Sequence, residues 1–246
     1  MVATQTDLRT VLPHGPRKNG IPVPSLTRLR NGRSLLAVVY RRTAAVQERL
    51  DAARSRIVTA ALSLVAERGY AACGVAEVAA RAGIGVGTVY RYFPGKGDLL
   101  AEVFRDACTR EVTAATAAGN RAAATGTHTD SVLAAVRTFC ERACRAPTLA
   151  YALLAEPIDA LVETERLAFR RSFADLLAAA IRAAVRDGEL PDQDASLTAP
   201  CLVGAIGEAL VVPLARGDVD ARVIDALETV TLRALGAPNP DVRSTT

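Results

Sequence analysis

The chain has 246 residues, half of them hydrophobic, with no tryptophan and few aromatic residues, a composition typical of an alanine- and leucine-rich helical protein. This length is enough for one sizeable hydrophobic core or two small ones. The five cysteines are odd in number and include no Cys-x-x-Cys pair, which argues against a disulfide framework and favours a reducing, cytoplasmic environment.

Positive charge is concentrated at the start of the chain. Residues 1–49 hold nine basic and two acidic side chains, whereas residues 101–246 hold 15 basic and 20 acidic ones. Residues 1–49 also contain four prolines and show no sustained hydrophobic period, so we interpret them as a basic, mostly disordered N-terminal arm. The arm is either a solubilising tail or a segment that contacts DNA phosphates. The apolar run at residues 35–40 is too short and too far from the terminus for a signal peptide.

Three short helices are predicted after the arm. Ile57, Ala61 and Leu64 form an apolar stripe that predicts a helix over residues 50–69, which Gly69 ends as a C-cap. A second helix is expected at residues 75–82, where apolar residues recur at steps of three and four. Gly83-Ile84-Gly85 then breaks the pattern and allows a sharp reversal before a third helix at residues 86–93.

The third helix carries an outward face that suits a DNA groove. Val89 and Phe93 face inward, whereas Gly87, Thr88 and Arg91 lie on the opposite side at about 100° per residue, flanked by Tyr90 and Tyr92. Pro94 stops the helix, and Lys96 stands at the start of the next one. A small, cationic, hydrogen-bonding face on a short helix is what a major groove accepts.

Three segments resemble the TetR/AcrR family of bacterial transcriptional repressors. They are AERGY at residues 66–70, EVAARAGIGVGTVYRYF at 77–93 and GKGDLL at 95–100. The resemblance implies an all-α fold with an N-terminal three-helix helix-turn-helix DNA-binding domain at residues 50–98. It also implies a C-terminal helical ligand-binding and dimerisation domain at residues 99–246. By the same resemblance, Tyr70 packs into the centre of the three-helix domain.

The resemblance also assigns residues to DNA contact. Cys73-Gly74 replaces the hydroxyl residue that usually caps the second helix, which removes one expected phosphate contact. Gly85-Val86-Gly87 departs from the usual polar sequence at the start of the recognition helix. The residues expected to contact DNA are Gly74, Val75, Val86, Gly87, Thr88, Tyr90, Arg91, Tyr92 and Lys96.

The rest of the chain reads as further helices with an effector pocket among them. Helices are expected at residues 97–118, 130–146, 163–187, 197–215 and 219–235, and another helix is expected to start at Pro147. Residues 113–129 are expected to form the fraying end of the first of these helices and a loop. Arg170 and Glu156 are possible polar anchors for a ligand, although a position on a solvated face is the favoured interpretation of both. The candidate pocket residues are Phe139, Tyr151, Leu154, Phe169 and Phe173, each of which also fits a plain core position.

The segment at residues 197–215 is almost long enough to cross a bilayer. Glu208 near its middle and two flanking prolines favour a buried interface helix over a membrane span. In the resembling family the last two long helices form a four-helix dimer interface. The interface residues expected on this basis are Gly204, Ala205, Gly207, Val223, Leu227 and Val230.

The favoured function is a homodimeric, ligand-responsive repressor that binds a palindromic double-stranded DNA operator and leaves it when a small apolar ligand binds. The alternative is a helix-turn-helix protein that acts without an effector or through a protein partner. A helical body without an enclosed cavity would favour this alternative, and a cavity would favour the ligand-responsive repressor. An enzyme is the least favoured class, because no nucleophile elbow or phosphate loop occurs. No cofactor, metal or membrane partner is expected. Cys140 and Cys144 lie one turn apart, and we interpret them as small buried residues in preference to redox sensors.

Overall fold

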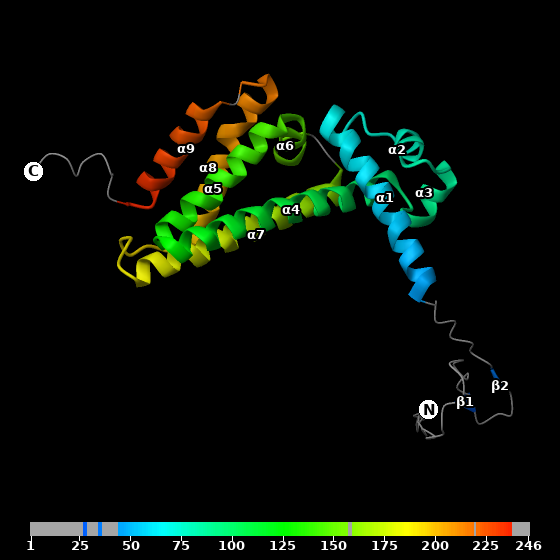
Figure 1. Ribbon diagram of the computed structural model, residues 1–246, viewed down its shortest axis with the longest axis horizontal. Coiled ribbons are helices and arrows are strands. Elements are labelled where there is room, and N and C mark those ends of the chain that lie inside the picture. The colour runs from blue at the N-terminus through cyan, green and yellow to red at the C-terminus, as the bar shows by residue number, and fades with distance from the viewer. Residues whose placement is uncertain (1–26, 29–33, 36–43, 157–158, 219, 238–246) are drawn as a thin grey trace, which may run out of the picture. The chain divides into compact units, whose positions relative to one another are not determined.

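The computed structural model describes residues 27–28, 34–35, 44–156, 159–218 and 220–237 (Figure 1). The chain divides into two compact units, residues 1–48 and 49–246. In the first unit, strands β1 (Thr27–Arg28) and β2 (Ser34–Leu35) pair antiparallel, with Thr27 opposite Leu35. Apart from these strands and the start of helix α1, the predicted arm lies outside the described residues.

The second unit is built from helices, which confirms the predicted all-α class. The first three are α1 (Ala44–Arg68), α2 (Val75–Ala82) and α3 (Val86–Tyr92). The next three are α4 (Lys96–Thr125), α5 (His128–Arg145) and α6 (Pro147–Leu154). The last three are α7 (Ala160–Arg186), α8 (Ala195–Arg216) and α9 (Ala221–Ala234).

Helices α1 to α3 form a small N-terminal bundle that we call the head. Ile57 and Leu64 of α1, Val78 of α2 and Val89 of α3 are all almost completely buried there. Helix α1 begins at Ala44, upstream of the expected residue 50. Its predicted stripe and its end at Gly69, where φ is +81°, are confirmed.

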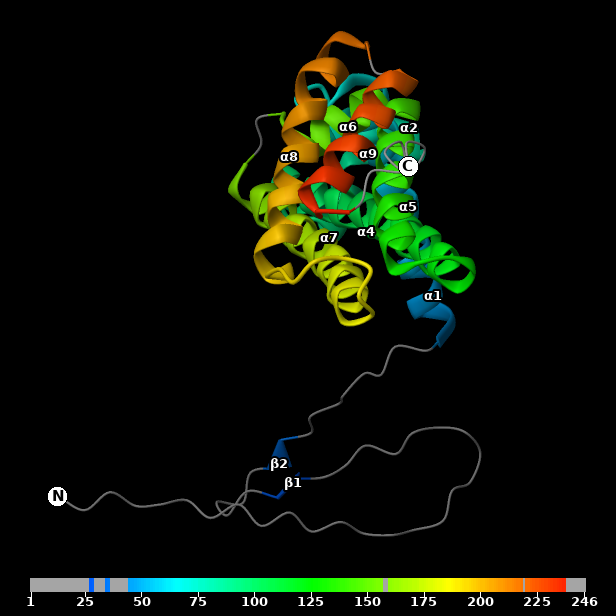
Figure 2. The ribbon, with the colours of Figure 1, turned by 90° about the vertical axis from the view of Figure 1, so that its left-hand side faces the viewer.

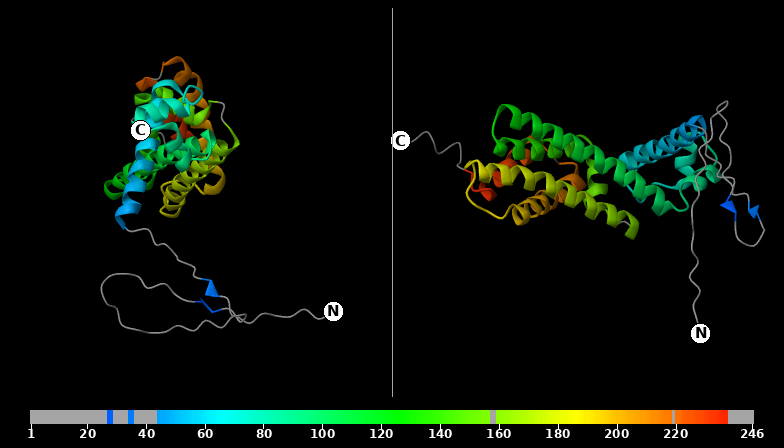
Figure 3. Two further views of the ribbon diagram at one scale, coloured as in Figure 1. Left: turned by 90° about the vertical axis from the view of Figure 1, so that its right-hand side faces the viewer. Right: turned by 90° about the horizontal axis from the view of Figure 1, so that it is seen from below.

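The remaining helices form the body. Helices α4, α5 and α7 pack against one another, α8 packs on α6 and α7, and α9 lies on α5 (Figures 1 and 2). Helices α4 and α7 run side by side over much of their length (Figure 3). The buried residues of these two helices and of α5 include Leu100, Phe104, Val136, Leu177 and Ile181. Helix α4 is a single helix that contacts α1 of the head through Glu102 and packs on α5 and α7 of the body.

Several predicted helix boundaries shift because capping side chains lie upstream of the apolar stripe. Asp159 accepts hydrogen bonds from the N–H groups of Leu161 and Val162, so α7 begins before the predicted residue 163. Asp194 likewise caps α8, which begins at Ala195, before the predicted residue 197, whereas Asp220 caps α9 at Ala221, after the predicted residue 219. A short polar side chain that satisfies the free N–H groups of the first turn sets the start of a helix.

The expected fraying end and loop at residues 113–129 is wrong. Helix α4 continues to Thr125, because alanine has the highest helix propensity and the segment packs along α5. Gly119 lies inside the helix, where a Cβ atom would come within 2.9 Å of Ser131 Oγ and 3.1 Å of its carbonyl oxygen. Gly119 therefore permits a close helix crossing rather than ending the helix.

Replacing Gly119 with valine is expected to lower the free energy of unfolding by about 1–3 kcal/mol, because the added side chain overpacks the crossing of α4 and α5. The matched control is Gly87→Ala in α3, where an added Cβ meets nothing within 4 Å and helix propensity favours alanine. Urea unfolding followed by circular dichroism gives both values. Equal stability of Gly119→Val and the wild type would contradict the close crossing.

Candidate DNA-binding surface and effector pocket

The turn between α2 and α3 has the geometry of a helix-turn-helix. Gly83 ends α2 in the left-handed conformation, with φ at +67°, and its N–H group closes the last turn. Gly85 then caps α3 with an extended backbone. Only glycine enters the left-handed region without a steric cost, so the reversal predicted at residues 83–85 is confirmed.

Helix α3 is held to the head by one side. Val89 and Phe93 are 1% and 3% exposed, and the guanidinium of Arg54 lies 5.2 Å from the centroid of the Phe93 ring. This contact is a cation–π interaction between α1 and the end of α3. The inward residues expected from the sequence thus fix the helix rigidly, which a surface that reads DNA requires.

The other side of α3 faces outward. Val86 and Tyr90 are 41% and 48% exposed, and Gly87 and Arg91 are exposed as well. A Cβ at Gly87 would meet no protein atom within 4 Å, so packing inside this chain does not require glycine there. The exposed face therefore has a glycine at its centre, surrounded by the apolar Val86, the aromatic Tyr90 and the cationic Arg91.

The other residues expected at DNA lie around this face. Thr88 and Tyr92 are half-buried beside it, and Lys96 is exposed at the start of α4, with its ammonium 5.5 Å from the centroid of the Tyr70 ring. Gly74 and Val75 are half-buried at the start of α2. The Gly74 N–H donates to Glu77 Oε2 at 3.0 Å, so this amide is already satisfied within the chain.

Tyr70 lies between the head and the body, and the expectation that it fills the centre of the head is wrong. Its hydroxyl donates to Asp159 Oδ2 at 2.6 Å, and its ring is only partly buried. Burial, and then the neighbouring carboxylate, raise the pKa of Tyr70 well above its usual range, while the hydrogen bond from Tyr70 lowers the pKa of Asp159. Tyr70 is therefore a neutral donor that ties α1 to the start of α7.

Glu156 completes the junction from the end of α6. Its carboxylate accepts hydrogen bonds from the N–H groups of Tyr70 at 2.8 Å and Ala71 at 2.9 Å. A Cβ at Gly69 would lie 3.1 Å from Glu156 Oε2, so a glycine lets the carboxylate approach this turn. Glu156, for which the sequence favours a solvated face and allows a ligand anchor, instead binds the turn after α1.

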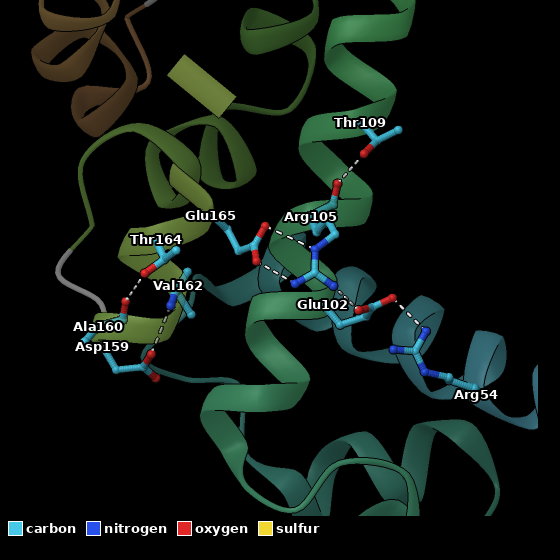
Figure 4. A network of polar contacts seen from close by, with 9 residues as sticks. All are labelled: Arg54, Glu102, Arg105, Thr109, Asp159, Ala160, Val162, Thr164 and Glu165. Carbon is cyan, nitrogen blue, oxygen red and sulfur yellow. Dashed lines mark hydrogen bonds and ion pairs between the residues drawn. The ribbon is translucent and has the colours of Figure 1, made fainter. Parts of the chain in front are cut away.

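A chain of ion pairs makes a second junction (Figure 4). Arg54 of α1 pairs with Glu102 of α4 at 2.7 Å, and Glu102 also pairs with Arg105 at 2.5 Å. Arg105 then binds Glu165 of α7 through both Nε and Nη2, at 3.1 and 2.5 Å. The head is thus tied to α4 and α7 by a continuous polar network.

A pocket of about 440 Å³ lies in the body, in the range typical of small-molecule sites. Phe139, Phe169 and Phe173 form one wall, with ring centroids 5.1 to 6.2 Å apart. Four of the five predicted pocket residues line it, whereas Tyr151 does not. Gly204 and Gly207, expected at the dimer interface, also line it, as do Val203, Ile206 and Val211.

Two arginines and one glutamate supply the charge of the pocket. Arg166 is 8% exposed, and its guanidinium donates to the carbonyls of Leu153 at 3.0 Å and Glu156 at 2.8 Å and to Glu163 at 3.0 Å. Arg170, one turn later on α7, lines the pocket and makes no hydrogen bond or ion pair with the described residues. Sequence reasoning missed Arg166, because burial of an arginine depends on helices that are distant in sequence.

The predicted interface residues are divided between two environments. Ala205 is exposed on α8, and Val230 is 48% exposed on α9. Leu227 is 7% exposed and Val223 is half-buried, both on the side of α9 that contains its buried residues. These two therefore help to hold α9 on the body of their own chain.

The cysteines and histidine do not form a reactive centre in the described part of the chain. Burial raises the pKa of Cys140 to about 12, and burial also raises the pKa of Cys144. Such thiols hold little thiolate at neutral pH, which disfavours redox sensing. His128, Asp187 and Glu189 have ligand atoms within 4.8 Å of one another, but both Glu189 oxygens already accept N–H groups at the start of α5.

The chain thus combines a helix-turn-helix, whose second helix is exposed on one side, with a larger helical body. Residues 57–103 match the profile of the bacterial regulatory proteins of the tetR family. These residues run from α1 into α4, so the tetR-family match covers the head and the start of α4.

Known relatives agree with this assignment. The HTH-type transcriptional repressor KstR of Rhodococcus jostii is 51% identical over 47 residues, which cover 19% of this chain and 22% of that protein. The fatty acid metabolism regulator protein of Bacillus subtilis is 39% identical over 51 residues, 21% of this chain and 26% of that protein. These matches span about a quarter of each curated relative.

The similarity of the whole fold extends further than the sequence match. The crystal structure of the regulator FadR from Bacillus subtilis in complex with stearoyl-CoA superposes with a TM-score of 0.63 over 75% of this chain and 99% of that one. The identity is 18%, so the comparison concerns the fold alone.

Proposed function

We propose that this protein is a homodimeric transcriptional repressor that binds a palindromic operator through α3 and leaves it when a small, mainly apolar ligand fills the body pocket. The observation that carries the proposal is the outward face of α3. Val86, Tyr90 and Arg91 are exposed there, on a helix anchored by Val89 and Phe93. A helix presented in this way fits the major groove, where base edges are distinguishable.

Dimerisation is supported by the exposed face of α8. Leu197 and Val212 are 63% and 53% exposed, and Cys201 and Ala205 lie exposed between them. Helix α8 is apolar and long enough to cross a membrane by length and composition, with 28% of its most apolar window buried within the chain. Glu208 on the same helix would cost about 2.5–3.5 kcal/mol in a bilayer, so a second copy of the chain is the favoured partner for this face.

Contacts between the pocket and the head support release by a ligand. Arg166 lines the pocket and binds carbonyl groups at the end of α6, while the Glu156 side chain just beyond binds the turn after α1. A ligand that displaces Arg166 or α6 would therefore bias the position of the head. The ligand releases DNA only as far as its affinity differs between the two arrangements.

The pocket also bears on the alternative of an effector-independent regulator. A space of about 440 Å³ lined by aromatic rings favours an effector-binding body over one that is packed solid. We accordingly propose an N-terminal arm at residues 1–49, a DNA-binding domain at 50–98 and an effector-binding and dimerisation domain at 99–246. A cytoplasmic location fits this role.

The test is binding of the purified protein to DNA spanning its own upstream region, measured by fluorescence anisotropy at two salt concentrations. We expect tight, sequence-selective binding by the wild type and a loss of at least about tenfold in Tyr90→Ala/Lys96→Ala, since an aromatic contact and a cation at the phosphates are removed. Arg182→Ala, on the exposed side of α7, is the charge-matched control and should bind normally. Equally weak, unselective binding by all three proteins would refute the repressor proposal.

A further inference from the structure

The pocket contains a cation without a protein partner. Arg170 lines the pocket beside Arg166, yet it makes no hydrogen bond or ion pair within the described part of the chain. The four hydrogen-bonded partners of Arg166 are three backbone carbonyls and Glu163, so its guanidinium is committed to structure. Arg170, which is exposed, is therefore the lining guanidinium that the described residues leave available to a ligand.

The charges around Arg170 favour an anion. Arg166 is one turn away on the same helix, and the mutual repulsion of the two guanidiniums contributes to a lowered pKa of Arg166, after the larger effect of burial. Glu163 neutralises part of the Arg166 charge, and Glu208 of α8 lines the same pocket without an ion pair to Arg170. The lining itself holds Arg166, Arg170 and Glu208, while Glu163 pairs with Arg166 from outside it, and an oxyanion bound at Arg170 would relieve the repulsion between the two arginines.

The rest of the pocket is largely apolar and has space for the apolar part of a ligand. Phe139, Phe169 and Phe173 form a tilted aromatic cluster on the side of α5 and α7. On α8, Gly207 has no side chain, and a Cβ there would point toward Leu154 Cδ2 at 3.9 Å. Apolar and cationic surfaces therefore share one pocket of about 440 Å³.

We infer that the ligand is an amphipathic anion, with an apolar body against the three phenylalanines and a carboxylate or phosphate-type oxyanion paired with Arg170. A planar guanidinium binds such oxyanions through two parallel hydrogen bonds, and Arg170 is an exposed residue of the pocket lining, where a ligand can reach it. This inference rests on the proposed effector-binding role of the body. It specifies a charged end that a purely apolar ligand lacks.

The experiment is isothermal titration calorimetry of the full chain, without DNA, using dodecanoic acid, dodecanol and dodecanoyl-CoA as probes. The variants are Arg170→Gln, which removes the charge at similar length, and Gly207→Val, which narrows the pocket toward Leu154. Arg171→Gln is the matched control, because Arg171 is the neighbouring arginine, is exposed like Arg170 and does not line the pocket.

We expect dodecanoic acid to bind the wild type at least tenfold more tightly than dodecanol. Arg170→Gln should abolish that preference, Gly207→Val should weaken both probes, and Arg171→Gln should leave both unchanged. Tighter binding of dodecanoyl-CoA, with the same loss in Arg170→Gln, would assign the oxyanion to the CoA phosphates. Equal binding of acid and alcohol, or an unchanged preference in Arg170→Gln, would overturn the inference.

The outcome also separates this inference from the proposed function. If dodecanoic acid binds through Arg170 but does not release operator DNA in the anisotropy assay, the inferred ligand class is supported and the proposed release mechanism is refuted. If no probe binds while operator binding is normal, the inferred ligand class is refuted and the proposed DNA-binding role is supported.

Discussion

Replacing both Leu197 and Val212 with aspartate is expected to convert a dimer into monomers and to lower affinity for a palindromic operator by about a hundredfold or more. The two side chains are 63% and 53% exposed along one face of α8. Burying each against a second copy would contribute about 1.5–3 kcal/mol, whereas an unpaired aspartate there would carry a desolvation cost. Two linked heads read successive major grooves, and a monomer loses the second one.

Sedimentation equilibrium and fluorescence anisotropy together check this prediction. The control is Ala179→Asp, which places the same charge at an exposed alanine of α7. The control should remain a dimer and bind the operator normally, and the double variant should keep its affinity for a half-site. A double variant that still sediments as a dimer would locate the interface elsewhere and leave the α8 face without its proposed partner.

Replacing Arg166 with alanine is expected to lower the free energy of unfolding by about 3–5 kcal/mol. Its side chain is 10% exposed, and its guanidinium donates to the carbonyls of Ala152, Leu153 and Glu156 as well as to Glu163. Removing it leaves buried carbonyl groups at the end of α6 without donors and opens a cavity beside the pocket. Breaking a buried charged network from one side has a cost of this size.

Chemical unfolding of Arg166→Ala, Arg166→Lys and the control Arg182→Ala measures the effect. Lysine keeps the charge but cannot reproduce the planar fork, so we expect it to fall between alanine and the wild type. Arg182 is exposed on the same helix, and its loss should change stability by less than about 0.5 kcal/mol. A wild-type unfolding midpoint for Arg166→Ala would show that the end of α6 does not depend on this guanidinium.

The helix-turn-helix at α2 and α3 could be predicted from sequence because its signals are local. Gly83, Gly85 and Pro94 each act on the backbone of adjacent residues, and Val89 and Phe93 share a face whatever lies beyond them. The same holds for Pro147 at the start of α6. These elements lie where the pattern places them.

The errors arose where a local signal had two meanings. Gly119 and the alanines around it read as the end of a helix, but packing of α4 against Ser131 of α5 needs a residue without a side chain. The family resemblance placed Tyr70 in the core of the head, and the sequence favoured a solvated face for Glu156, whereas the Glu156 carboxylate accepts a hydrogen bond from the Tyr70 N–H across 86 residues of sequence. Sequence periodicity does not encode which distant helix end meets a given turn.

By itself, then, the sequence determined the all-α class, the helix-turn-helix and four of the five pocket residues, because helix period and backbone stereochemistry are properties of neighbouring residues. Only the tertiary structure decided that Arg166 is buried, that Arg170 lines the pocket with no hydrogen-bond or ion-pair partner among the described residues, and that Gly207 lines this pocket. Burial and charge pairing depend on side chains brought together from α5, α6, α7 and α8, and their effect on a group is set by distance in space.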